Sequence, residues 1–203
     1  VWNNPYFRSL APLGFVNYGG LIAIQTLWAA PWMIRVAHYS PLQAAAGMFW
    51  LNLAMLCSFW LWGMVNPVLA RRGLHVDRLI ALGLPVSFIF LGLLVAAGPR
   101  LGSWTTAVWA FFCMGSTFVS LAQPAVAMAF PAALAGRALS AYNLVLFIGI
   151  FVVQWGVGLA VDAFQAFGLG AVGAFQCAMA LYLLCSVASY GYFVASKPHN
   201  HGQ

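Results

Sequence analysis

The stretch Leu79–Ala97, LIALGLPVSFIFLGLLVAA, is nineteen residues long and contains no charged side chain. An α-helix needs about 20 mostly apolar residues to cross the hydrocarbon core of a bilayer. This stretch therefore predicts a transmembrane helix, and stretches of similar composition recur along the chain. Six spans are expected, at residues 12–34, 42–70, 79–97, 104–134, 139–164 and 169–195.

The composition of the whole chain predicts the same class of protein. Of its 203 residues, 64% are hydrophobic and 5% are charged, whereas a soluble domain has roughly a quarter charged residues. The sequence is therefore interpreted as an all-α membrane protein with the lipid bilayer as its main partner. The basic residues are scattered over short loops rather than clustered with aromatic residues, which argues against a nucleic acid partner.

The breaks between the predicted spans have the chemistry of helix ends. Ser40 is a suitable N-cap before Pro41, and Arg71-Arg72-Gly73 supplies cations and a glycine at a helix C-terminus. Residues 98–102 have the composition of a turn, and residues 135–137 are expected to separate the fourth and fifth spans.

The distribution of basic residues predicts the orientation. One set of connections holds Arg8, Arg71, Arg72, Arg78, Arg137 and Lys197, and the opposite set holds Arg35 and Arg100. Cytoplasmic loops are enriched in Lys and Arg, so we expect a multi-pass protein of the inner or plasma membrane with both termini in the cytoplasm. Residues 12–195 would form the membrane domain and residues 196–203 a cytoplasmic tail. Because the first residue is Val1, a fragment or a processed product is expected.

Polar and aromatic residues form stripes along four of the predicted spans. Such residues in a membrane tend to face the interior of the bundle or a cavity. The candidate solute-binding residues are Tyr18, Gln25, Trp28, Trp32, Asn52, Ser116, Ser120, Gln123, Asn143 and Gln154. One interpretation is a wet cavity that binds a solute, and the other is hydrogen bonding between neighbouring helices.

The sequence contains few residues that could carry acid–base or metal chemistry. The chain has no Glu, its two acids are Asp77 and Asp162, and its four His residues lie in loops or the tail. The four Cys residues form no CxxC pair, so neither a disulfide framework nor a zinc site is predicted. No serine has a membrane-embedded His as a base. We therefore expect no enzyme activity, no metal and no cofactor.

The segment Gly63–Gly73, GMVNPVLARRG, resembles the cytoplasmic signature of the major facilitator superfamily, a glycine followed by an Asp-Arg pair and then two basic residues. Gly63, Arg71 and Arg72 match that signature, while Pro67 and Val68 stand where the family has an acidic and a basic residue. The stretch containing Pro131, Gly136-Arg137-Ala138, Gly156, Gly158 and Asp162 is similar to the link between the fourth and fifth helices of the family's second half.

The resemblance implies the C-terminal six-helix half of an alternating-access secondary transporter, built as a 3+3 inverted repeat. Pro5-Tyr6-Phe7-Arg8 is similar to the end of the cytoplasmic linker between the halves, which implies that residues 1–11 end such a linker. It implies that the first and fourth helices line the path, with the second and fifth beside it. It also implies gating or topology roles for Gly63, Arg71, Arg72, Arg137 and Asp162. The expected partners are an N-terminal six-helix half or a second copy, together with a small solute. Because the candidate binding residues include few fixed charges, a neutral or amphipathic solute is favoured. An anion is the alternative if the missing half supplies Arg residues. The alternative is a non-transporting membrane subunit whose polar helix faces bind another protein.

Overall fold

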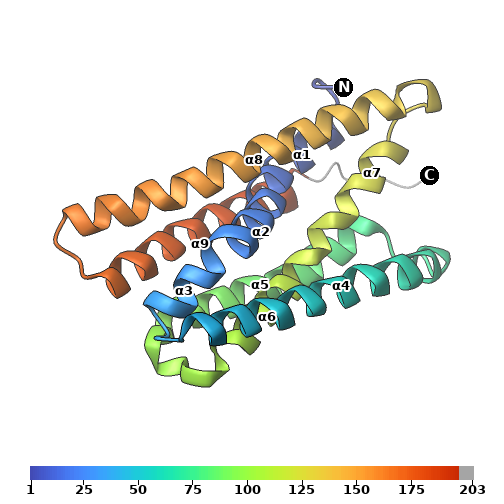
Figure 1. Ribbon diagram of the computed structural model, residues 1–203. Helices are drawn as coiled ribbons and strands as arrows, with labels where there is room; N and C mark the ends of the chain where they lie inside the picture. Colours follow the sequence, from blue (N-terminus) through green and yellow to red (C-terminus); the bar gives the residue numbers. More distant parts are fainter. Residues whose placement is uncertain (197–203) are drawn as a thin grey trace.

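The computed structural model describes residues 1–196, which are helical along most of their length (Figure 1). Within these residues, five helical segments are long and apolar enough to cross a membrane. They are Pro5–Arg35, Pro41–Asn66, Val76–Met128, Ala132–Ala166 and Ala171–Ala195. Helices of this length and composition indicate a multi-pass membrane protein.

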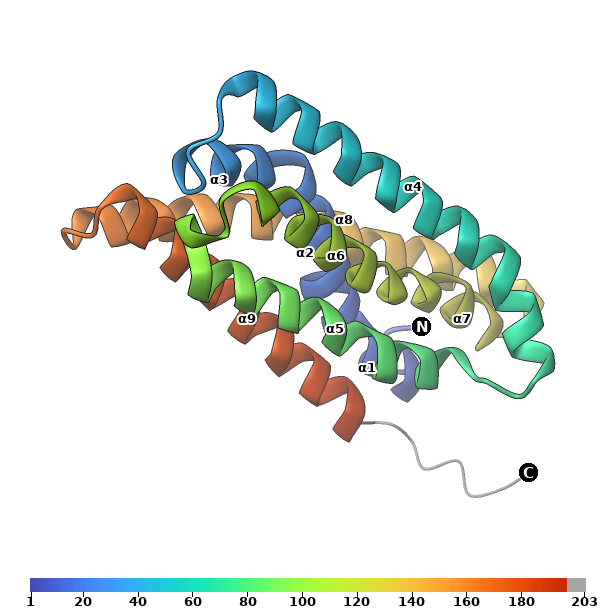
Figure 2. The same cartoon turned by 90° about the horizontal axis from the view of Figure 1, so that it is seen from below.

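The segment Val76–Met128 has 53 residues, more than one crossing requires, and it folds back on itself. Its outward leg is α5 (Val76–Ala97), and η3 (Gly98–Trp104) forms the turn, where Gly98 and Gly102 have φ values of 50° and 48°. Positive φ is accessible to glycine without a steric penalty. The return leg consists of α6 (Thr105–Ser116), η4 (Thr117–Leu121) and α7 (Ala122–Met128), with α6 packed along α5 (Figure 2).

The first segment begins earlier than the sequence predicts. Asn4 caps it, because the Asn4 side-chain oxygen accepts a hydrogen bond from the Phe7 backbone N–H at 3.0 Å, and Pro5 occupies the first helical position. Residues 5–11, expected in a linker, are therefore helical. The segment alternates between α and π geometry through α1 (Pro5–Leu13), η1 (Gly14–Tyr18), α2 (Gly19–Ala23), η2 (Ile24–Trp28) and α3 (Ala29–Arg35).

The start of α4 (Pro41–Arg71) confirms the predicted cap at Ser40. The Gln43 backbone N–H donates to Ser40 Oγ at 3.2 Å, and the Ser40 backbone N–H donates to Gln43 Oε1 at 2.8 Å. These reciprocal bonds form a capping box, which satisfies two backbone donors at the helix end.

The fourth and fifth predicted spans meet at a different place from the one expected. The break lies at residues 129–131, and α8 (Ala132–Ala166) already contains Gly136 and Arg137. The expected break at 135–137 was therefore wrong. Pro131 has no backbone N–H for a further α7 turn, and proline restricts the preceding residue to extended conformations.

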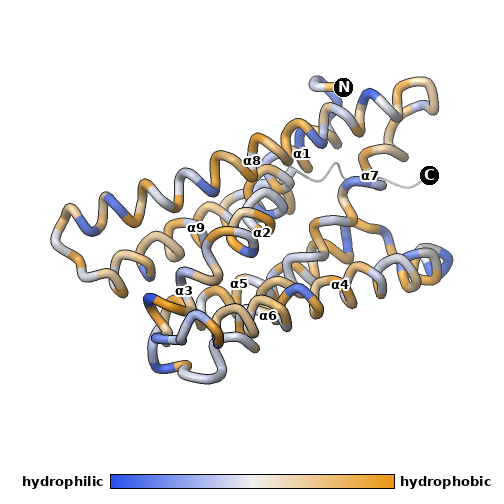
Figure 3. The backbone as a smooth tube through the Cα atoms, viewed as in Figure 1, coloured by the Kyte–Doolittle hydropathy of each residue, from blue (hydrophilic) through white to orange (hydrophobic). Residues whose placement is uncertain are grey.

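After α8, the chain turns at Gly168, where φ is 92°, and ends its described part with α9 (Ala171–Ala195). The N-terminus and the end of α9 lie at the same end of the bundle, together with the α4–α5 and α7–α8 connections (Figure 1). Apolar residues predominate along the helices, and hydrophilic residues gather mostly at the connections (Figure 3). We call the end that holds α1 the near end and the opposite one the far end.

Two hydrophobic cores hold the helices together. The core toward the far end is built around Trp32 and Trp109, whose rings meet edge to face at 5.9 Å. The core toward the near end contains Phe7 and Tyr142, whose ring centroids are 6.0 Å apart. These contacts fix the first helical segment at the centre of the bundle, between α4, α6, α8 and α9.

Candidate functional site

The π-helical segment η2 carries two polar residues of the first span, Gln25 and Thr26. Gln25 is buried, and its Nε2 donates to Asn52 Oδ1 on α4. Asn52 in turn donates from Nδ2 to the Met48 carbonyl at 2.7 Å and stays exposed. Since π turns are frequent at functional sites, this position is the starting point for the candidate site.

On the other side of η2, two hydrogen bonds join the first span to α8. The Trp28 indole N–H donates to the Gln154 carbonyl at 3.1 Å, and Gln154 Nε2 donates to Thr26 Oγ1 at 3.2 Å. We call Gln25, Thr26, Asn52 and Gln154 the polar band. It connects the first segment to α4 on one side and to α8 on the other.

A groove lies beside the polar band, between η2–α3 and α8. It consists of two hollows of about 380 and 670 Å³ that share Trp28, Gly158 and Asp162. The smaller hollow also touches Gln154, and its wall is otherwise mostly apolar, with Leu27, Phe151, Trp155 and Leu159. We call the two hollows together the Trp28 groove.

Trp28 is held firmly in this groove. Besides its bond to Gln154, its ring meets the Phe175 ring edge to face, with centroids 6.1 Å apart. A Cβ added at Gly158 would lie 3.3 Å from the Trp28 ring. The glycine therefore gives the indole the room that it occupies.

The larger hollow contains both signs of charge. Arg35, the last residue of α3, and Asp162 of α8 line it together with Gln165. Within the described part of the chain, neither charged side chain makes an ion pair or a hydrogen bond. The groove thus offers a cation, an anion and an aromatic face within one hollow.

The other predicted binding residues lie outside the Trp28 groove. Trp32 is fully buried against Trp109. Ser116 is buried and donates to the Phe112 carbonyl at 2.9 Å, and Ser120 donates to the Thr117 carbonyl at 2.7 Å. The remaining three residues are half-buried elsewhere in the bundle, namely Tyr18, Gln123 and Asn143.

The residues expected to act in gating or topology divide between the two ends. Gly63 is exposed, and a Cβ added there would meet no atom within 4 Å. Arg71, Arg72 and Arg137 are exposed toward the near end, whereas Asp162 lines the groove toward the far end. Lys197, one of the basic residues used for orientation, lies outside the described residues.

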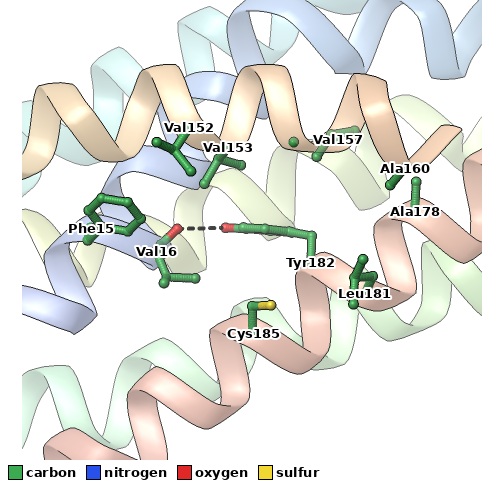
Figure 4. Close-up of a pocket in the computed structure, with 11 residues that line it drawn as sticks. Phe15, Val16, Val152, Val153, Val157, Ala160, Ala178, Leu181, Tyr182 and Cys185 are labelled. Carbon is green, nitrogen blue, oxygen red and sulfur yellow. Dashed lines mark hydrogen bonds between the residues drawn. The ribbon is translucent and has the colours of Figure 1, made fainter. Parts of the chain in front are cut away.

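A third pocket, of about 220 Å³, lies between η1, α8 and α9 (Figure 4). Its walls are apolar, with Val16, Val153 and Leu181 among them, and the Tyr182 hydroxyl at its edge donates to the Val16 carbonyl at 3.5 Å. Because it offers few polar groups for recognition, the Trp28 groove is the stronger candidate site.

Sequence reasoning missed several residues of the groove. Phe151 and Trp155 were not among the candidates, nor was Thr26 of the polar band, and Arg35 was used only for orientation. Pro31, which follows η2 by three residues, is a usable signal, since a proline inside a helix removes a backbone hydrogen bond and disturbs the turn before it.

No group of three or more His, Cys, Asp or Glu side chains that could hold a metal ion occurs within residues 1–196. The comparisons with protein-family models, curated proteins and solved structures yield no match to this chain. The groove and the polar band are therefore the features of the chain that indicate function.

Proposed function

We propose that this protein is one six-helix half of an alternating-access secondary transporter, similar to the C-terminal half of a major facilitator superfamily carrier. In this proposal, α5 and the η3–α7 leg each cross the membrane, which makes six crossings. The solute binds at the Trp28 groove and passes the polar band.

The polar band is the observation that carries the proposal. Polar side chains inside a membrane are costly and usually face the bundle interior or a water-filled cavity. Here they join three spans beside a hollow that contains Arg35 and Asp162. Gln25 and Gln154 each use Nε2 within the bundle, and their amide oxygens are acceptors that a solute or water could use.

Irregular geometry in two corresponding spans supports the same proposal. The first span contains the π segments η1 and η2, and the fourth contains the 3₁₀ segment η4, followed by Pro124. In a 3+3 inverted repeat these two spans occupy equivalent positions, and interrupted helices in equivalent positions are a pointer to a transporter's binding site.

The exposed aromatic residues favour a second bundle as the partner. Phe49, Trp50 and Trp60 on α4 are at least 60% exposed, as are Phe147, Phe151 and Trp155 on α8. By contrast α5 and α9 pack together, on the far side of the bundle from α4 (Figure 2). We therefore place the second six-helix half, or a second copy, against α4 and α8, with the near end in the cytoplasm as the basic residues favour.

Uptake by membrane vesicles from cells that express the protein tests this proposal. The vesicles are offered a defined mixture of isotope-labelled amino acids, sugars and nucleosides, and the solutes retained are measured by mass spectrometry. We expect Gln25→Leu to reduce the uptake of the transported solute at least tenfold, because the polar band loses its link between two spans.

Gln176→Leu is the matched control, since Gln176 Nε2 donates to the Val95 carbonyl at 2.7 Å, away from the groove. Both variants lose one interhelical hydrogen bond, and only Gln25→Leu should lose uptake. If vesicles with the parent protein accumulate no solute above vesicles without it, the transport proposal fails. It also fails if the two variants lose uptake equally. Loss of a co-purifying protein from Gln25→Leu without any uptake defect would favour the membrane-subunit alternative.

A further inference from the structure

The far end of the Trp28 groove places two opposite charges on one hollow of about 670 Å³. Arg35 comes from α3 and Asp162 from α8, so two different spans supply them. Both are exposed, and neither is neutralised by an ion pair within the described residues. Both charges are therefore available to a ligand.

Helix stability does not account for Asp162. The residue lies four positions before the end of α8 at Ala166, and a negative charge near a helix C-terminus is unfavourable. Acids are also scarce, because the whole chain has only two. The other one, Asp77, accepts a hydrogen bond from the Tyr6 hydroxyl at 2.8 Å. Asp162 is therefore an exposed charge that no ion pair or hydrogen bond within the described residues uses.

Trp28 adds a second feature that suits a cation. Its ring orientation is fixed by Gln154 and Phe175, and the face of an indole ring attracts ammonium groups. The adjoining smaller hollow, with Leu27, Phe151 and Trp155, suits an apolar body. Figure 1 shows that α3 and the C-terminal part of α8 lie at the end of the bundle opposite the N-terminus.

We infer that the Trp28 groove binds a zwitterionic amphiphile. Its ammonium group lies between Asp162 and Trp28, its anionic group meets Arg35, and its apolar body occupies the smaller hollow. This inference rests on the proposed function and names the class of solute. Two sources have this chemistry, namely a free amino acid with an apolar side chain and the headgroup of a zwitterionic phospholipid.

Binding by the full chain in nanodiscs of phosphatidylglycerol, a lipid without a cationic group, tests the inference. Calorimetry is done with L-phenylalanine, with its amide, which keeps only the ammonium, and with N-acetylphenylalanine, which keeps only the carboxylate. We expect Asp162→Asn to weaken phenylalanine and the amide about fivefold and to leave the N-acetyl compound unchanged. Arg35→Gln should weaken phenylalanine and the N-acetyl compound instead. A loss of roughly fivefold corresponds to about 1 kcal/mol, the upper range for an exposed ion pair.

Arg100→Gln is the matched control, since Arg100 is exposed in η3 and does not line the groove. A second arm adds phosphatidylethanolamine to the nanodiscs. If phosphatidylethanolamine competes with phenylalanine for the groove, the lipid headgroup is the source. The same conclusion follows if native mass spectrometry shows this lipid bound to the parent protein and absent from both groove variants. Phenylalanine binding without lipid competition identifies a free solute.

The inference is overturned if Asp162→Asn and Arg35→Gln bind all three compounds as the parent protein does and also retain the lipid to the same extent. That outcome leaves the uptake test of Gln25→Leu untouched, because that variant keeps both charges. If the uptake test fails while binding still depends on the two charges, the transport proposal is wrong and the inferred binding site stands.

Discussion

At the scale of single residues, the structure separates two uses of the same polar chemistry in one helical segment. Asn17 is buried, and its Nδ2 donates to Ser189 Oγ on α9 at 2.8 Å. Gln25 also donates across helices, but it belongs to the same π segment, η2, as Leu27 and Trp28, which line the groove. The sequence left hydrogen bonding between helices and solute binding as alternatives, and the placement of each side chain favours a different one.

This contrast predicts the behaviour of Asn17→Leu. The variant loses a buried interhelical hydrogen bond, and such bonds in membranes contribute roughly 0.6 to 1.7 kcal/mol. Thermal unfolding in detergent should show a lower midpoint than the parent protein. Solute uptake per folded molecule should stay the same, and a large uptake defect at unchanged stability would show that Asn17 belongs to the path.

Gly158 gives a second prediction at this scale. In Gly158→Ala the new Cβ lies 3.3 Å from the Trp28 ring, so the indole must shift by a few tenths of an ångström. We expect weaker phenylalanine binding with little change in the unfolding midpoint. Gly156→Ala is the control, because a Cβ at Gly156 meets open space; equal binding by the two variants would contradict the assigned place of Trp28.

At the scale of helices, the apolar spans could be predicted from the sequence. The direction in which each helix turns its polar residues could not. Tyr18, Gln25 and Trp32 recur every seven residues, which in a regular α-helix keeps them on one face. The π segment Ile24–Trp28 begins just before Gln25 and ends before Trp32. One extra residue in a turn rotates all later residues by about 100°, so Trp32 faces the core instead.

Helix ends show the same limit. Ser40 was predicted correctly because its capping partners are local in sequence. The start of α8 was misplaced because Gly136 and Arg137 have the composition of a break, while Pro131 provides the actual one. The set of residues that line the groove depends on how spans distant in sequence pack together. A single sequence with two irregular helices does not indicate this packing directly.

The packing of the first segment against α8 predicts a strong effect of a small substitution. A Cβ at Gly149 would lie 2.2 Å from the Phe15 carbonyl oxygen, which is backbone and has little freedom to move. Gly149→Ala should therefore separate the helices and lower the unfolding midpoint by several degrees. Gly156→Ala should be neutral or slightly stabilising, because alanine favours helix by about 1 kcal/mol over glycine. Equal midpoints would contradict this close approach.

At the scale of the whole molecule, the account places a water-accessible path on one face of the bundle and lipid on the other. The first segment lies at the centre, α4 and α8 flank the polar band, and α5 and α9 lie behind it (Figure 2). The central claim is that the polar band faces water, although the protein around it is apolar.

Thiol labelling tests this claim most directly. Cys57, Cys113, Cys177 and Cys185 are replaced by alanine, and a single cysteine is placed at Thr26 or at Ile89. Both positions are exposed, and both lie about two turns from the far end of their helices, Thr26 in the polar band and Ile89 on the outer face of α5. The account predicts that a membrane-impermeant maleimide labels Thr26→Cys in intact membranes and does not label Ile89→Cys. Protection of Thr26→Cys equal to that of Ile89→Cys would contradict it.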